Sequence, residues 1–164
     1  MIEYEVIDNF LPKDEFIKLQ SLILGNEFSW YYNDYIINDG REESNYQFTH
    51  LFFWTESKSA HSIKLMPLVN KLGIKEGQLF KLKANLNVKT PNHEYGGYHT
   101  DGYKNKITSI FYINTNNGWT EFKDGSKVES VENRMLVFDS NLEHTGVSCT
   151  DQKRRVLFNF NYER

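Results

Sequence analysis

The sequence contains a single cysteine, Cys149, so no disulfide can form within the chain. No apolar run approaches the ~18 residues that a membrane-spanning helix needs. The first residues, MIEYEVIDNF, lack the basic and apolar regions of a signal peptide. A net charge of −3 provides no general attraction to nucleic acid or anionic membranes. These absences predict a soluble protein in a reducing, cytoplasmic setting, with neither a membrane nor a nucleic acid as its partner.

The chain is long enough for one hydrophobic core and short for two. At 164 residues, with no linker-like composition and no internal repeat, it is predicted to be a single domain spanning 1–164. Aromatic residues make up 15% of the sequence, and because they suit pleated surfaces they favour a β-rich core. Nothing in the sequence predicts an oligomeric state.

Helical patterns are confined to the first half of the sequence. One follows Pro12, and a second, in 59–73, carries Ile63, Met66, Val69 and Leu72 at helical spacing, with Pro67 expected to kink or restart it. Strand-like runs are EYEVID near the N-terminus, YQFTHLFFW at 46–54 and, from residue 79 onward, about seven short runs separated by turn residues. The sequence therefore predicts a mainly β fold, a jelly roll with a barrel core over roughly 79–162 and two or three N-terminal helices, within roughly 10–75, packed on one sheet.

The stretch GGYHTDGYKNKITSIFYIN, residues 96–114, contains a candidate metal-binding pair. Side chains two positions apart on a strand point to the same side, so His99 and Asp101 are expected about 7 Å apart along the backbone. His144, which opens a later strand-like run, is the candidate third ligand. Two histidines and one carboxylate select non-haem Fe(II) and leave positions open for a keto acid and O2. Zinc accepts the same ligand types, but a catalytic zinc site usually keeps one open position.

A keto acid with a distal carboxylate needs a cation at the far end of its pocket, and arginine matches a carboxylate best. Arg155 opens the last strand-like run, RVLFNFNY, eleven residues after His144. Alternation along that run predicts a polar face pointing into the barrel mouth and an apolar face pointing into the core. Arg154, which points the other way, is the second choice. The polar face comprises Arg155, Leu157, Asn159 and Asn161, and the apolar face Val156, Phe158, Phe160 and Tyr162.

These pieces resemble a known family. The segments YHTD, ITSIFYIN, NGWTEF, NRMLVFDSNLEHTGVS and RRVLFNFNY, together with VIDNFLPKDEF and FSWYY near the N-terminus, are similar to the Fe(II)/2-oxoglutarate-dependent dioxygenases. The nearest resemblance is to small prolyl-4-hydroxylase-like members, including phage-encoded ones, for which a host cytoplasmic location is expected. GWTEF departs from many relatives, which have a second glycine there. The resemblance implies a double-stranded β-helix in which His99, Asp101 and His144 bind iron and Arg155 binds the distal carboxylate of 2-oxoglutarate.

The same resemblance implies further roles. Tyr112 is expected to hydrogen-bond the distal carboxylate, and Asn87 or Asn85 to contact the cosubstrate. The implied cofactors are Fe(II), 2-oxoglutarate and O2, with ascorbate in support. The implied reaction hydroxylates an unactivated C–H bond and releases succinate and CO2. Its substrate is a peptide or a small molecule, with a peptidyl proline, a free amino acid and other small molecules as candidates. Residues 26–46 and 89–98 are the expected gates to the site.

Two other classes of function remain open from the sequence. The chain is alternatively a non-catalytic jelly-roll binding or structural module, in which His99 and Asp101 belong to a solvated turn and Arg155 is an ordinary strand charge. It is alternatively a cupin-like metalloenzyme that uses no 2-oxoglutarate. A binding module would produce no succinate, whereas an oxygenase would. A cupin-like enzyme that uses no 2-oxoglutarate would keep its activity when Arg155 is replaced, whereas an oxygenase would lose affinity for 2-oxoglutarate.

Overall fold

The computed structural model describes residues 3–37, 46–55, 57–102 and 106–163. The expected gate at 26–46 therefore lies partly outside the described residues. In chain order the elements are β1 (Tyr4–Ile7), α1 (Lys13–Leu24), β2 (Tyr31–Asn33), β3 (Gln47–Trp54), β4 (Ser57–Lys58), the 3₁₀ helix η1 (Ser62–Leu65), α2 (Met66–Lys71), β5 (Leu79–Val88), β6 (Ile107–Tyr112), β7 (Trp119–Phe122), β8 (Lys127–Glu129), β9 (Met135–Asp139), β10 (His144–Val147) and β11 (Arg154–Tyr162).

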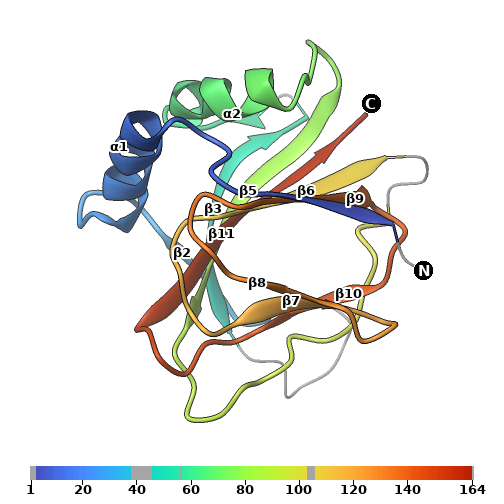
Figure 1. Ribbon diagram of the computed structural model, residues 1–164. Helices are drawn as coiled ribbons and strands as arrows, with labels where there is room; N and C mark the ends of the chain where they lie inside the picture. Colours follow the sequence, from blue (N-terminus) through green and yellow to red (C-terminus); the bar gives the residue numbers. More distant parts are fainter. Residues whose placement is uncertain (1–2, 38–45, 56, 103–105, 164) are drawn as a thin grey trace.

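The strands form two facing antiparallel sheets. The larger has the order β1-β9-β6-β11-β5-β3-β2, with β4 added beside β3, and the smaller has the order β10-β7-β8. Figure 1 shows the small sheet opposite the large one, with both helices outside, against the far face of the large sheet. The expected jelly roll with helices on one sheet is confirmed.

Alternation along β11 creates two separate cores. Val156, Phe158 and Phe160 face the helices and pack in a cluster with α1 and α2 residues such as Phe16. Leu157 faces the other way and packs between the sheets in a second cluster with Ile110, Phe122, Leu136 and Phe138. Because successive side chains leave a strand on opposite faces, the residues between the aromatic ones are directed into the barrel.

The second helical segment differs in one respect from the pattern expected of it. Pro67 does restart the helix, at the junction of η1 and α2. Ile63 is 70% exposed and Met66 44% exposed, however, whereas Leu65 and Leu68 are buried. Three residues per turn in the 3₁₀ helix shift the register, so Ile63 and Met66 turn away from the core, whereas Val69 and Leu72, the later members of the expected stripe, pack in or against it. In the described part of the chain, no helix has both the length and the apolar character to cross a membrane.

Candidate metal centre

Backbone pairing brings the two histidines together. The N–H of His99 donates to the carbonyl of His144 at 3.0 Å, and the N–H of His144 donates to the carbonyl of His99 at 2.9 Å. Residues that exchange both hydrogen bonds lie directly opposite each other, so their side chains leave the pair on one side. The imidazole centroids are 4.5 Å apart. The N–H of Asp101 continues the pairing by donating to the carbonyl of Ser140 at 3.1 Å.

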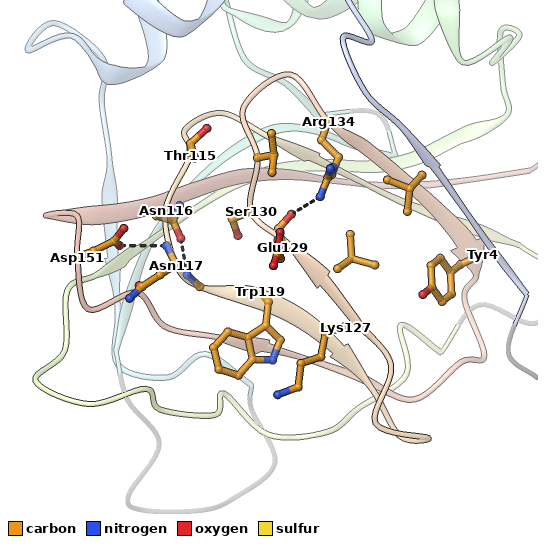
Figure 2. Close-up of a pocket in the computed structure, with 14 residues that line it drawn as sticks. Tyr4, Thr115, Asn116, Asn117, Trp119, Lys127, Glu129, Ser130, Arg134 and Asp151 are labelled. Atoms are coloured by element: carbon orange, nitrogen blue, oxygen red, sulfur yellow. Dashed lines mark hydrogen bonds between the residues drawn. The ribbon is translucent and has the colours of Figure 1, made fainter.

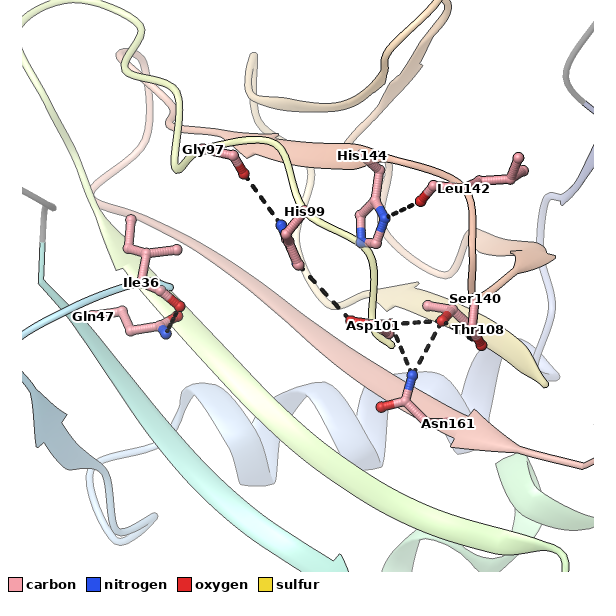
Figure 3. Close-up of polar contacts among 10 residues, drawn as sticks. All are labelled: Ile36, Gln47, Gly97, His99, Asp101, Thr108, Ser140, Leu142, His144 and Asn161. Carbon is pink, nitrogen blue, oxygen red and sulfur yellow. Dashed lines mark hydrogen bonds and ion pairs between the residues drawn. The ribbon is translucent and has the colours of Figure 1, made fainter. Parts of the chain in front are cut away.

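The three expected metal ligands converge on one point (Figure 3). Ligand atoms of His99, Asp101 and His144 lie within 4.8 Å of one another, and His99 Nε2 is 3.9 Å from Asp101 Oδ1. Among the described residues, no second cluster of this kind is found. Two imidazole nitrogens and one carboxylate oxygen on one side of a point fit the ligand set of non-haem Fe(II).

Hydrogen bonds outside the cluster orient both imidazoles. His99 Nδ1 lies 3.1 Å from the carbonyl oxygen of Gly97, and His144 Nδ1 lies 2.9 Å from that of Leu142. A carbonyl oxygen can only accept, so each Nδ1 carries the proton and each Nε2 is left with a lone pair for a metal. Burial lowers the pKa of His144, which favours the same neutral form.

Asp101 is held by its other oxygen. Thr108 donates its hydroxyl to Asp101 Oδ2, and Asn161 donates Nδ2 to the same oxygen at 2.8 Å. Burial raises the pKa of this carboxyl, but His144, the two hydrogen bonds and His99 together outweigh burial and hold the pKa below its usual value. The carboxylate is therefore ionised, and Oδ1 remains directed at the histidines.

Arg155 lines the same cavity and is a buried cation that has no anionic partner among the described residues. It is 2% exposed, and its guanidinium donates Nε to Ser130 Oγ at 2.8 Å and Nη2 to Thr120 Oγ1 at 3.2 Å. Both acceptors are neutral, and no carboxylate of the described residues pairs with Arg155. A buried charge without a counter-ion is costly, and an anionic ligand would remove that cost.

The cavity that joins these groups measures about 280 Å³. Its wall also contains Asn85, whose buried Oδ1 has no hydrogen-bond partner in the described part of the chain. The guanidinium without a counter-ion makes this wall fit an anionic ligand, while the amide oxygen of Asn85 can accept a hydrogen bond from a donor such as a hydroxyl or a water molecule. The lining residues are Ile36, Ile37, Gln47, Lys81, Lys83, Asn85, Asn87, His99, Thr100, Asp101, Ile110, Thr120, His144, Gly146, Arg155, Leu157 and Asn159.

Of the other residues expected at the site, Asn87 lines the cavity, whereas Tyr112 and Arg154 do not. Asn87 lines the cavity opposite Arg155 in the β5–β11 register. Tyr112 is fully buried and not part of the lining; its hydroxyl donates to Thr120 Oγ1 at 2.8 Å, and its ring centroid lies 5.7 Å from Arg155 Cζ. Arg154 points away from the cavity and donates Nη2 to the carbonyl of Leu24, at the end of α1.

Four contributors to the site carry no signal of their own in the sequence. Thr108 and Asn161 hold Asp101, while Thr120 and Ser130 hold Arg155. Asn161 belongs to the polar face expected on the last strand, which is the one available hint. The other three are small hydroxyl residues on separate strands and turns, and only the register of the sheets brings them to the site.

A second, larger hollow of about 700 Å³ lies between β1 and β8 (Figure 2). It contains none of the three expected metal ligands. Its cations are satisfied by the protein itself: Arg134 pairs with Asp8, and Lys127 lies 4.4 Å above the Trp119 ring and 3.4 Å from Glu121. We refer to it below as the β1–β8 groove.

No protein-family model and no curated protein matches the sequence. Solved structures do match its fold. A Burkholderia pseudomallei oxidoreductase of the 2OG-Fe(II) oxygenase family aligns with a TM-score of 0.70 at 9% identity, over 98% of this chain and 85% of the other. A Pseudomonas putida prolyl-4-hydroxylase aligns with a TM-score of 0.63 at 16% identity, over 100% and 94%.

Streptomyces hygroscopicus HygX, solved with nickel and 2-oxoglutarate bound, aligns with a TM-score of 0.62 at 11% identity, over 99% of this chain and 83% of the other. The chain therefore has the fold of the 2-oxoglutarate-Fe(II) oxygenases, as its sequence resemblance implied. At these identities the likeness establishes the fold, and the chemistry has to be argued from the residues of the site.

Proposed function

We propose that the protein is an Fe(II)- and 2-oxoglutarate-dependent oxygenase that hydroxylates an unactivated C–H bond. The observation that supports this most is one cavity with a His-Asp-His cluster at one place and an unpaired, buried guanidinium at another. A metal site alone would fit many proteins. The combination fits a ligand that chelates a metal at one end and carries a carboxylate at the other.

Each residue has a role in this proposal. His99, Asp101 and His144 bind Fe(II), and Thr108 and Asn161 orient the carboxylate. The bound metal and cosubstrate supply the oxidising chemistry, with O2 consumed and succinate and CO2 released.

The protein also binds and encloses the cosubstrate. Arg155 pairs with its distal carboxylate, and Asn85 or Asn87 contacts it along β5. Tyr112 does not contact that carboxylate directly. Its hydroxyl donates to Thr120, which also accepts from Arg155, so Tyr112 helps to hold the guanidinium in place. Apolar lining residues such as Leu157 and Ile110 exclude water around the bound molecule.

The substrate is a peptide or a small molecule. A peptidyl proline is the first candidate, supported by the similarity to the Pseudomonas putida prolyl-4-hydroxylase and by the sequence resemblance. Free amino acids and other small molecules are the alternatives. Mass spectrometry of a peptide and metabolite panel, incubated with the protein, Fe(II), ascorbate and 2-oxoglutarate, identifies the product by its added oxygen.

The function is tested by metal content together with succinate formation. In the presence of O2, ascorbate and the substrate panel, wild-type protein should bind one Fe(II) per chain and convert 2-oxoglutarate to succinate and CO2, while Asp101→Ala should lose both properties. Asp14→Ala, which removes an exposed carboxylate in the first turn of α1, away from the cluster, is the matched control and should keep both. The oxygenase proposal fails if wild type forms no succinate, or if Asp101→Ala binds iron as well as wild type. Succinate formation that survives Arg155→Met would favour a cavity that does not use this arginine.

A further inference from the structure

Two lysines on β5 line the same cavity. Lys81, Lys83, Asn85 and Asn87 alternate along the strand and all belong to the cavity wall. In the β5–β11 register Asn87 lies opposite Arg155, Lys83 opposite Asn159, and Lys81 opposite Asn161, the partner of Asp101. Asn159 is four residues beyond Arg155, roughly 13 Å along the strand. The lysines therefore stand at the metal end of the cavity, far from the arginine end.

Neither lysine has an acidic partner among the described residues. Other lysines of the protein do: Lys106 pairs with Glu163 at 2.7 Å, and Lys127 with Glu121 at 3.4 Å. Among the described residues of the cavity wall, Asp101 alone carries a carboxylate, and it belongs to the His-Asp-His cluster. Burial, followed by repulsion from Lys81, lowers the pKa of Lys83 to about 8, against the attraction of Asp101, so the amine is still mainly protonated at neutral pH.

In the proposed complex the positive charges of Lys81 and Lys83 have no counter-charge. A metal dication, the Asp101 carboxylate, the Arg155 guanidinium and the dianion 2-oxoglutarate have formal charges that cancel. Lys81 and Lys83 are then an uncompensated positive pair beside the metal, in a partly buried place where charge is expensive. A neutral substrate would leave that pair unsatisfied, whereas an anionic one would neutralise it.

We propose that Lys83, together with Lys81, binds an anionic group of the substrate, a carboxylate or a phosphate, next to the carbon that is oxidised. This inference rests on the proposed function and narrows its list of substrates: free amino acids and acid-bearing small molecules fit it, whereas a peptidyl proline fits only where an anionic group of the peptide lies beside the ring. Arg155 and the lysines then divide the work by position: the arginine binds the acid group of the cosubstrate, and the lysines bind that of the substrate.

A binding experiment without turnover tests this directly. The protein is loaded with Ni(II) in place of Fe(II) and saturated with 2-oxoglutarate, which occupies Arg155. Inorganic phosphate and acetate are then titrated separately by calorimetry into wild type, Lys83→Met, Lys83→Arg and Lys127→Met. Methionine keeps the length of the side chain and removes the charge. Lys127, which has its own partner in Glu121, is the matched control.

Wild type and Lys127→Met should bind one further anion per chain, and Lys83→Met should weaken that binding by about tenfold or more, as expected for loss of a charge-assisted hydrogen bond. Lys83→Arg should keep most of it, which also guards against a folding defect in the methionine variant. Tighter binding of phosphate than of acetate indicates a phosphate-bearing substrate, and the reverse order a carboxylate-bearing one.

Three results overturn the inference while leaving the oxygenase intact. The first is that wild type binds 2-oxoglutarate but no second anion, and the second is that Lys83→Met binds the second anion as well as wild type does. The third is that Lys83→Met loses affinity for 2-oxoglutarate itself, which would assign the lysine to the cosubstrate. Failure of wild type to bind 2-oxoglutarate at all is a different outcome, and it counts against the proposed function instead.

Discussion

Arg134 and Arg155 are two arginines in two hollows of one barrel, and they differ in whether the protein supplies a carboxylate partner. Arg134, beside the β1–β8 groove, donates Nε to Asp8 Oδ1 at 2.6 Å and Nη2 to Asp8 Oδ2 at 3.0 Å, a bidentate ion pair. Arg155, in the cavity of the His-Asp-His cluster, is more deeply buried, and among the described residues it donates to hydroxyls such as those of Ser130 and Thr120 and pairs with no carboxylate. The more costly charge is the one that the protein leaves unpaired.

The same contrast extends to the lysines of the two regions. Lys127 beside the groove has Glu121 and the face of Trp119, whereas Lys81 and Lys83 in the cavity have no acidic partner among the described residues. Charges paired within the chain stabilise the fold, and buried charges left without a partner indicate where ligands bind. The size of the hollow is a poorer guide, since the groove is the larger of the two.

The largest expected effect comes from Arg155→Met. It should weaken 2-oxoglutarate binding by roughly 2–5 kcal/mol, because it leaves the distal carboxylate unpaired in a buried place. In the absence of ligand the same substitution should leave the free energy of unfolding unchanged or higher, because a buried charge without a partner is removed. Calorimetry under anaerobic conditions measures the first effect and chemical denaturation the second.

Arg134→Met should have the opposite pair of effects on stability and on 2-oxoglutarate binding. It should lower stability slightly and leave 2-oxoglutarate affinity unchanged, because its partner is Asp8 and no ligand is involved. Equal loss of stability in the two variants, or equal loss of 2-oxoglutarate affinity, would break the distinction between the two arginines.

Asn161→Leu should reduce metal affinity by about 10–100-fold, the usual cost of removing a group that orients a metal ligand. Asn161 is buried and donates to the oxygen of Asp101 that faces away from the histidines. Asn159→Leu, on the same face of β11, is the matched control and should bind metal normally. Competition with a coloured chelator measures both, and similar affinities for the two variants would count against the role of Asn161.

Gly118→Ala tests how tightly Arg155 is packed. A Cβ there would lie 2.7 Å from the carbonyl oxygen of Val147 and 2.9 Å from Arg155 Cδ. Overpacking of this kind costs about 1–3 kcal/mol, and it should also weaken 2-oxoglutarate binding by displacing the guanidinium. Thermal unfolding with and without 2-oxoglutarate measures both effects. An unchanged ligand-induced shift in melting temperature would mean that Arg155 tolerates displacement.

Asp8→Asn should have the smallest effect, roughly 0.2–1 kcal/mol at neutral pH, as for other exposed ion pairs. The hydrogen bond from Arg134 holds the pKa of Asp8 below its ordinary 3.8. A carboxylate with a lowered folded pKa stabilises the fold above the unfolded pKa, and this contribution is lost as the pH falls through the folded value. The stability difference between wild type and variant should therefore begin to shrink near pH 4 and vanish only once the pH is below the folded pKa of Asp8. A difference that persists in acid would contradict the assignment.

Much of the fold follows from local sequence. Runs such as 79–88 and 154–162 alternate clearly and become β5 and β11, and β11 has the faces expected of it. The metal cluster is predictable because His99 and Asp101 are two residues apart on an extended segment. The helical register around Pro67 was harder to predict, because a 3₁₀ turn changes which side chains face the core.

The surroundings of the site depend on contacts between distant strands. Thr120 and Ser130 reach Arg155 from 35 and 25 residues away, and Asn161 reaches Asp101 across 60 residues. No local pattern encodes those partnerships, since they arise from the order and register of the sheets. For the same reason the sequence did not indicate that Thr120 would stand between Tyr112 and the cavity, or that Lys81 and Lys83 would face the metal cluster.

The central claim is that the His-Asp-His cluster and Arg155 bind the two ends of one molecule. Anaerobic spectrophotometric titration of the Fe(II)-loaded protein with 2-oxoglutarate tests it most directly. The account predicts a weak visible charge-transfer band that requires both metal and keto acid, saturates at one equivalent per chain, and needs far more 2-oxoglutarate in Arg155→Met. Absence of the band in wild type, or the same titration curve in Arg155→Met, would contradict it.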